Sequence, residues 1–320
     1  MLKEASDKPK ITVITPVYNE QLSLPNYEAA VKETLLNNSG YDIEILLVDD
    51  GSDDESWKII CAMCERDKSF KALRLSRNFG SHAALTAGFK AATGDAIATL
   101  ACDLQDSPET IFEFLEKWRK GAAIVWGHRR KREDVWWRRL TSICFNKIIS
   151  RFAMPRGSRF ATGSFLLADR RVVDCFNEFS ERNRVTFALF AWTGFDQEVV
   201  DYDRIKRKAG KSSWNLTRIL KAGYDTFIGF SALPSNVIFW LATSTALISI
   251  ILGSYIFLRW LFFDPLPGWT GLMLAMTFFF AVNFMVLSVL VQYLQRIFTE
   301  VAARPIYFIS EARNTDGALD

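Results

Sequence analysis

Two long stretches toward the C-terminal end of this 320-residue chain contain no charged side chain. The first lies between Asp225 and Arg259, and the second lies between Asp264 and Arg296. Each stretch exceeds the ~20 apolar residues that a helix needs to cross the hydrocarbon core of a bilayer. We therefore predict a transmembrane α-helical hairpin over residues 233–295. A buried hairpin in a soluble protein is the alternative, but it would require a far larger apolar core around it.

The two predicted membrane helices run from Leu233 to Leu261 and from Gly271 to Leu294. Lys and Arg are frequent before the first helix and follow the second, whereas the connecting loop offers only Arg259. Because positively charged residues remain on the cytoplasmic side of a membrane, both chain ends are expected in the cytoplasm. The chain then divides into a cytoplasmic domain at 1–232, the hairpin, and a cytoplasmic C-terminal segment at 296–320.

Short apolar runs alternate with helical patterns in the region before the hairpin. The runs that predict strands are residues 11–15, 43–48, 72–76, 96–100 and 122–126. Helices are predicted near 24–36, from a cap at Ser52 onward, at 82–92 and at 108–120. Near-continuous apolar strands that alternate with helices are typical of a mostly parallel sheet covered on both faces. The predicted fold class is therefore α/β.

Polar segments follow all five predicted strands. They read "PVYNE", "DDGSDD", "RNFG", "CDLQD" and "GHRRKR" in chain order. Ligands of parallel sheets bind at the carboxyl ends of the strands, which lie on one edge. Each segment alone is equally well explained by a turn or a helix cap, but five together are not. Their mixture of acids, amides, Gly and Arg suits a phosphorylated, metal-bound ligand.

Five motifs extend this pattern along the chain: "TPVYNE", "VDDGSDD", "LSRNFG", "CDLQDSPE" and "RKAGKSSWN". In order and spacing they resemble family 2 glycosyltransferases of the polyisoprenyl-phosphate branch, which includes dolichol-phosphate mannose synthases and bactoprenol glucosyltransferases. The resemblance covers nearly the whole chain and implies a Rossmann-like GT-A domain. The paired membrane spans and the closing "RPIYFI" most resemble the bactoprenol members. They imply an inverting enzyme of the bacterial inner membrane, which transfers a hexose to a polyisoprenyl phosphate.

The preferred substrates by this resemblance are UDP-glucose and undecaprenyl phosphate. The positions that match nucleotide-binding residues are Pro16, Tyr18, Glu20, Asp50, Arg77 and Asp103. Asp103 and Gln105 match the metal-contacting positions of an Asp-x-Asp-x-Gln pattern, which implies Mg²⁺ or Mn²⁺. The first Asp of that pattern is Ala101 here. One or two carboxylates with substrate phosphates often hold Mg²⁺, so Asp103 can suffice.

The resemblance also implies a set of residues around the phosphates. Arg129 matches a position near the donor phosphates, and Arg207 with Lys211 belongs to a loop that closes over the diphosphate. Arg138 and Ser142 match residues that meet the acceptor phosphate. Cationic side chains can hold two anions together. A lipid phosphate is already anionic, so no general base is strictly required.

Two amphipathic segments connect the predicted site to the membrane. Residues 134–152 and 214–230 mix Trp and aliphatic side chains with Arg and Lys, as helices in the membrane interface do. The alternative for each is packing against the domain or against another subunit, which leaves a homo-oligomer open. No nucleic-acid partner is expected.

Two other functions remain compatible with the sequence. The first is the same chemistry with GDP-mannose or another UDP-sugar. The second is a catalytically impaired membrane scaffold that binds a nucleotide sugar, because Ala101 and Leu166 stand where the family carries Asp and Arg. Metal-dependent turnover distinguishes the scaffold from the enzyme. A transporter is disfavoured, since the two predicted spans offer no inverted repeat and contain only one charged residue, Arg259 at the end of the first.

Arg138 and Ser142 lie four residues apart, so both project from one face of a helix. We expect Arg138→Ala to raise the KM for polyisoprenyl phosphate and to leave nucleotide-sugar binding nearly unchanged. Arg138→Lys should rescue only partly, because Lys keeps the charge and loses the planar two-pronged donor. Acceptor kinetics beside a donor-binding isotherm measure both effects. If Arg138→Ala weakens donor binding as much as Asp50→Ala does, Arg138 contacts the donor diphosphate instead.

Overall fold

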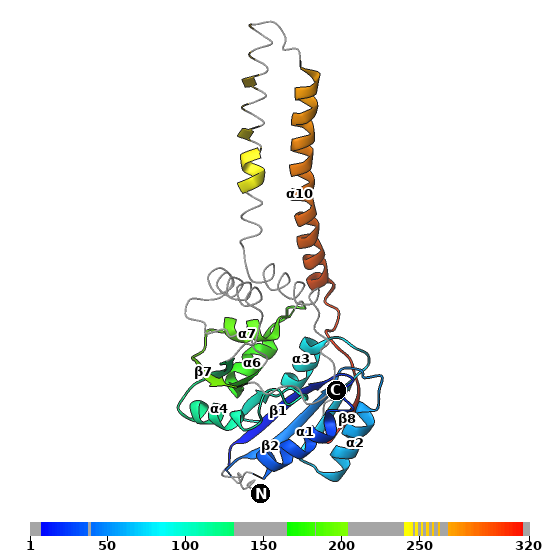
Figure 1. Cartoon of the computed structure of the whole chain (residues 1–320), viewed down its shortest axis with the longest axis vertical. Helices are drawn as coiled ribbons and strands as arrows, with labels where there is room; N and C mark the ends of the chain where they lie inside the picture. Colours follow the sequence, from blue (N-terminus) through cyan, green and yellow to red (C-terminus); the bar gives the residue numbers. More distant parts are fainter. Residues whose placement is uncertain are drawn as a thin grey trace.

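The computed structural model describes residues 8–37, 40–130, 165–182, 184–203 and 268–315, with a few residues between 240 and 262. These residues form an α/β domain from which one long helix projects (Figure 1). The amphipathic helices predicted at 134–152 and 214–230 lie outside the described residues, and so does most of the first predicted membrane helix.

Eight strands in the described part of the chain form one sheet, in the order β7-β5-β6-β4-β1-β2-β3-β8. The strands are β1 (Lys10–Val17), β2 (Asp42–Asp49), β3 (Phe70–Leu75), β4 (Ala96–Thr99), β5 (Ile124–Arg129), β6 (Leu166–Asp169), β7 (Gln197–Tyr202) and β8 (Ile309–Arg313). β1 is parallel to β2 and β4, and β2 is parallel to β3. β6 is antiparallel to both β4 and β5, so those two strands also share a direction. All five predicted strands are therefore confirmed, and their carboxyl ends lie on one edge.

The helices follow the prediction closely, with one correction. They are α1 (Leu24–Val31), the π-helical turn η1 (Lys32–Leu36), α2 (Ser56–Arg66), α3 (Ser81–Ala91), α4 (Thr110–Arg119), α6 (Arg170–Glu178), α7 (Thr186–Trp192) and α10 (Trp269–Ala302). The helix start predicted at Ser52 is wrong, because α2 begins four residues later. Ser52 lies instead in a turn, where its N–H donates to Asp49 and its hydroxyl accepts from the backbone of Asn19.

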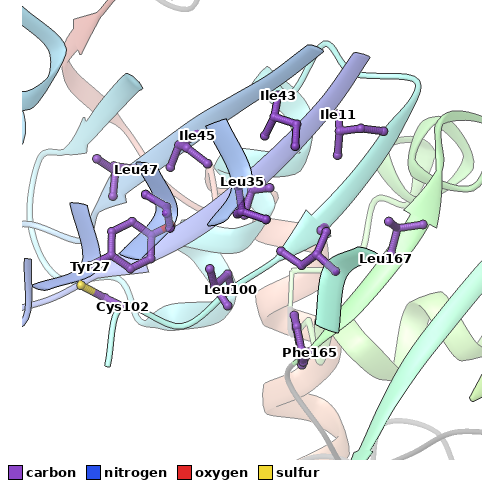
Figure 2. Close-up of a cluster of buried hydrophobic side chains, with 14 of the residues drawn as sticks. Ile11, Tyr27, Leu35, Ile43, Ile45, Leu47, Leu100, Cys102, Phe165 and Leu167 are labelled. Carbon is purple, nitrogen blue, oxygen red and sulfur yellow. The ribbon is translucent and has the colours of Figure 1, made fainter. Parts of the chain in front are cut away.

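The side chains of the strands alternate between two apolar cores. Ile11 and Val13 of β1 point into a core that also contains side chains of α1, α2 and α4, part of which Figure 2 shows. Ile14 points to the opposite core, which α3, α6 and α7 cover. Both faces of the sheet are thus buried, as near-continuous apolar strands require. Polar side chains that serve a ligand must lie at the strand ends.

One helix among the described residues, α10, is long and apolar enough to cross a membrane. The candidate span covers Phe278–Ala302 and is not buried in the protein. Its large apolar side chains are exposed, with Phe284 at 65% and Val291 at 60%. The second predicted membrane helix, Gly271–Leu294, lies within α10.

The chain returns to the sheet after α10. The helix ends at Ala302, the next residue adopts left-handed backbone angles, and β8 then pairs antiparallel with β3. The loop before α7 also contacts the end of α10, because the N–H of Arg182 donates to the Glu300 carboxylate at 2.8 Å. β8 is not among the predicted strands. It ties the C-terminal segment to the same sheet as the N-terminal strands.

Helix α3 approaches β1 so closely at Gly88 that a Cβ there would lie 2.5 Å from Cγ2 of Ile14. We expect Gly88→Ala to lower the melting temperature of the domain. Overpacking a core costs about 1–3 kcal/mol, which exceeds the helix stabilisation of up to ~1 kcal/mol that Ala brings over Gly. Gly271→Ala is the matched control, since a Cβ at this helical glycine meets nothing within 4 Å. Equal melting temperatures for Gly88→Ala and the wild type would contradict the expectation.

Candidate active site

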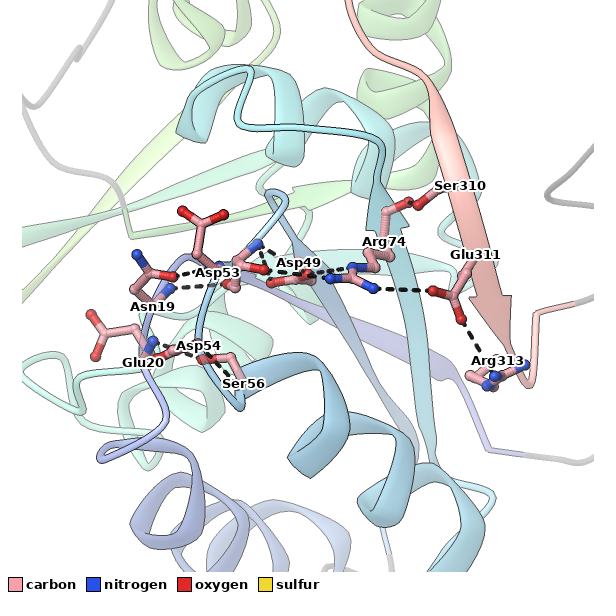
Figure 3. Close-up of polar contacts among 11 residues, drawn as sticks. Asn19, Glu20, Asp49, Asp53, Asp54, Ser56, Arg74, Ser310, Glu311 and Arg313 are labelled. Atoms are coloured by element: carbon pink, nitrogen blue, oxygen red, sulfur yellow. Dashed lines mark hydrogen bonds and ion pairs between the residues drawn. The ribbon is translucent and has the colours of Figure 1, made fainter.

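The loops that follow β1 and β2 are joined by hydrogen bonds into one surface at the edge of the sheet (Figure 3). The N–H of Asn19 donates to the Ser52 hydroxyl at 3.0 Å, and its side-chain carbonyl accepts from the N–H of Asp53 at 3.0 Å. The N–H of Glu20 donates to the Ser56 hydroxyl at 2.9 Å. Tyr18 and Glu20, two of the predicted donor-binding residues, are therefore held by the loop after β2.

Two residues at this edge adopt left-handed backbone angles without being glycine. Asn19 has φ 55° and Leu104 has φ 52°. Asn tolerates this conformation, but for a bulky residue it costs about 1–3 kcal/mol and is typical of functional sites. Leu104 makes the chain turn between Asp103 and Gln105, and the N–H of Gln105 donates to the Asp103 carboxylate at 3.2 Å. The backbone strain thus lies between the two predicted metal ligands.

Asp50 is only 3% exposed, and both of its carboxylate oxygens accept backbone hydrogen bonds. The donors are the N–H groups of Phe79 and Gly80, each at 2.8 Å. Burial raises the pKa of this carboxyl group, and the two amides partly oppose that rise. The neighbouring Gly51 has φ 67°, and a Cβ there would lie 2.4 Å from the backbone of Arg77. Asp50 therefore fixes the loop between β3 and α3.

Arg129, at the end of β5, belongs to a hydrogen-bonded cluster with Tyr202 and Asp106. Its Nε donates to the Tyr202 hydroxyl at 3.2 Å, and that hydroxyl donates to Asp106 at 2.6 Å. Burial and the negative charge of Asp106 raise the pKa of Tyr202 to about 12. Burial alone would lower the pKa of Arg129, but the bond to Tyr202 and the charges of Asp106 and Asp103 raise it. Arg129 is thus a fixed positive charge near Asp103.

The donor set for a metal ion is small. No group of three or more His, Cys, Asp or Glu side chains in the described part of the chain is arranged to hold one. Asp106 is 1% exposed and already bonded to Tyr202, whereas Asp103 and Gln105 are partly exposed. One carboxylate and one amide fit Mg²⁺ or Mn²⁺ when substrate phosphates supply further oxygens.

The predicted site residues fall into two neighbouring groups on the described part of the sheet edge. Pro16, Tyr18, Glu20, Asp50 and Arg77 lie around the ends of β1, β2 and β3, and Asp103, Gln105 and Arg129 follow β4 and β5. Arg138, Ser142, Arg207 and Lys211 lie outside the described residues. Leu166 is fully buried at the start of β6 and belongs to the apolar core.

Sequence reasoning missed Tyr202 and the pairing of Asp106. Asp106 stands in the "CDLQD" segment, so its type and place gave a signal, although its partner did not. Tyr202 ends β7, a strand that the apolar pattern does not mark, and reaches Asp106 from 96 residues away.

The Tyr202 hydroxyl donates a short hydrogen bond to the buried Asp106, so we expect Tyr202→Phe to destabilise the domain. The loss of a hydrogen bond to a charged group costs about 1.5–3 kcal/mol, which thermal unfolding measures. Tyr41→Phe is the control, because it removes the same hydroxyl from a half-buried ring that lies against Arg119. A Tyr202→Phe protein no less stable than Tyr41→Phe would show that Asp106 does not need this bond.

Several known proteins are similar to this chain. A solved mannosyltransferase of Pyrobaculum calidifontis, in complex with GDP-Man and Mn²⁺, is 16% identical, with a TM-score of 0.45 over 88% of each chain. An uncharacterized glycosyltransferase of Synechocystis is 35% identical over 307 residues, 94% of this chain and 95% of the relative. A prophage-derived bactoprenol glucosyl transferase of Shigella flexneri is 32% identical over 305 residues, 95% of this chain and 98% of the relative. Residues 12–176 also match the sequence model of glycosyl transferase family 2. The chain therefore belongs to glycosyl transferase family 2 and is a glycosyltransferase.

Proposed function

We propose that this enzyme transfers a hexose from a nucleotide sugar to a polyprenyl phosphate, with inversion at the sugar carbon. The preferred substrates are UDP-glucose and undecaprenyl phosphate, and the preferred site is the cytoplasmic face of a bacterial inner membrane. The observation that supports this most strongly is the similarity to the Shigella bactoprenol glucosyl transferase. It extends over 95% of the chain, so it includes the predicted membrane hairpin and the C-terminal segment as well as the domain.

The nucleotide binds, in this proposal, to the group of residues around β1, β2 and β3. Tyr18 is 42% exposed beside the rigid turn at Asn19 and offers a ring surface to the base. Glu20 lies next to it, and its carboxylate accepts from the Ser23 hydroxyl at 2.6 Å. Asp50 contributes through the loop that it holds, on which Arg77 lies.

The diphosphate then lies toward Asp103, Gln105 and Arg129. A divalent cation held by Asp103 and Gln105 would neutralise negative charge on the leaving diphosphate. Arg129 supplies a positive charge that Tyr202 and Asp106 keep in place, and such preorganised charges need no rearrangement during the reaction. An oxygen of the lipid phosphate attacks the sugar carbon as the bond to the diphosphate breaks. Arg138, Ser142, Arg207 and Lys211 are proposed to bind the two anions.

The membrane part is proposed to be the two-helix hairpin at 233–295, with the domain at 1–232 and the segment at 296–320 on the same side. The sheet supports this by a simple count. β8 follows α10 and pairs with β3, which precedes it. If α10 crosses the bilayer, the chain between β7 and α10 must cross as well. The apolar run at 233–261 supplies that second crossing.

The main alternative is a membrane scaffold that binds nucleotide sugar without turnover. Ala101 favours it, because the loop after β4 then offers one metal-site carboxylate, Asp103. Leu166 does not favour the scaffold, because its side chain is part of the buried apolar core. The same chemistry with GDP-mannose remains a second alternative for the donor.

Labelled nucleotide sugars incubated with membranes and undecaprenyl phosphate test these possibilities together. We expect label from UDP-glucose to become lipid-extractable in the presence of Mg²⁺ or Mn²⁺ and not in EDTA. Asp103→Ala should lower the rate at least ~100-fold, the scale on which the loss of one preorganised electrostatic contact is felt. Asp42→Ala, at the amino end of β2, removes an exposed carboxylate from the opposite edge and should leave the rate unchanged.

Three outcomes would contradict the proposal in different places. If label is transferred from GDP-mannose and not from UDP-glucose, the proposed donor is wrong. If Asp103→Ala is fully active in EDTA, the proposal that Asp103 and Gln105 hold a divalent cation is wrong. Binding of nucleotide sugar without transfer of any label identifies a scaffold.

A further inference from the structure

Asp49, the residue before Asp50, is a carboxylate with no exposed surface at the end of β2. Each of its oxygens lies 3.3 Å from the N–H of Ser52, and Oδ2 lies 3.4 Å from Nε of Arg74. Burial raises the pKa of Asp49, and the hydrogen bonds from Ser52 and then the charge of Arg74 oppose that rise. A buried carboxylate that loses its partner destabilises the structure around it.

Arg74 extends from β3 and contacts three other groups besides Asp49. Its Nη2 donates to the carbonyl oxygen of Ser52 at 3.4 Å, and its Nη1 donates to Glu311 at 3.1 Å. The guanidinium carbon also lies 5.6 Å from the ring centre of Trp57. Figure 3 shows the guanidinium between Asp49 and Glu311. Arg74 therefore bridges the loop after β2 and the C-terminal strand β8.

The loop that Arg74 holds supports the proposed nucleotide site. Ser52 binds Arg74 through its carbonyl and accepts from Asn19 through its hydroxyl, so the left-handed turn beside Tyr18 rests on it. The next residue, Asp50, accepts hydrogen bonds from the N–H groups of Phe79 and Gly80 in the loop after β3. A shift of Ser52 would thus change the position of the loop after β1.

The segment that follows α10 contacts this region at further points. The Ser310 hydroxyl donates to the carbonyl of Arg74 at 3.2 Å, and the N–H of Ser76 donates to the carbonyl of Phe308 at 2.9 Å. The Phe308 ring lies 6.3 Å from the ring of Phe79, whose N–H binds Asp50. The segment after α10 therefore touches the loop after β3 directly and reaches the loop after β2 through Arg74.

We propose that Arg74 and Glu311 are positioning residues for the nucleotide-sugar donor, so that the C-terminal strand helps to set the geometry of the donor site. This inference rests on the proposed function, because it takes the loops after β1, β2 and β3 as the place where the donor binds. Neither residue contacts the donor itself. They act on it through Asp49, Ser52 and Asn19.

The decisive variant is Glu311→Gln in the full-length protein, because it removes the charge at one end of the bridge and nearly keeps the shape. We expect the KM for the donor to rise about two- to fivefold, the effect of a partly exposed ion pair. The kcat and the KM for polyprenyl phosphate should not change. Arg74→Lys keeps a positive charge against Asp49 but loses the planar fork, so it should raise the donor KM as well.

Asn314→Ala is the matched control. Asn314 donates to the carbonyls of Cys64 and Phe70 at 2.8 Å each, so it holds the same end of the chain without contacting Arg74. We expect this variant to lower the melting temperature and to leave the donor KM unchanged. A donor KM that rises in both variants in proportion to the loss of melting temperature would reduce the role of Glu311 to docking the strand.

Hydrogen exchange of the peptide at residues 49–56 gives a second measurement that needs no substrate. Exchange should become faster in Glu311→Gln and remain unchanged in Asn314→Ala. If wild-type protein transfers no sugar but exchange responds as expected, the bridge is real and the proposed function is wrong. If wild-type protein transfers sugar and Glu311→Gln changes neither exchange nor the donor KM, the positioning role is refuted.

Discussion

A parallel sheet that is buried on both faces allows polar side chains almost nowhere except at the ends of its strands. The few polar groups inside the sheet need compensation, as Glu44 in β2 illustrates. It accepts from the Thr12 hydroxyl and pairs with Lys10 and Lys71. Although burial acts to raise the pKa of Glu44, these partners lower it to about 2. The same constraint collects Tyr18, Asp50, Asp103 and Arg129 at the opposite ends of their strands, where loops rather than strands decide their positions.

Those loops are held by each other and not by the sheet alone. Asn19 binds the loop after β2, Asp50 binds the loop after β3, and Tyr202 binds Asp106 in the loop after β4. Each contact joins residues far apart in sequence, and in most of them at least one of the two polar groups is buried or half-buried. A site built in this way is rigid at its base. The acidic residues beneath it, Asp49 and Asp50, are engaged by protein groups.

The apolar runs predicted β1 to β5 because each of these strands is buried on both faces. β6, β7 and β8 escaped this reasoning for different reasons. β6 has four residues, β7, "QEVVDY", contains as many polar as apolar residues, and β8, "ISEAR", pairs on one side only at the edge of the sheet. The predicted cap at Ser52 failed because Asn19 and Asp49 compete for its polar groups. The types of the site residues could be predicted from motifs, whereas the partnership of Tyr202 with Asp106 depends on tertiary structure.

The position of β8 also constrains how the protein is made. β3 is synthesised before α10, and its outer edge pairs with residues such as Ala312 and Arg313, which are synthesised after that helix. Until then the growing sheet carries an unpaired edge, the kind of surface on which strands of other molecules can add. Domains usually fold as soon as they emerge during translation, but this one has to wait for α10. The sheet can be completed only after α10 has been synthesised and the chain has returned to the domain.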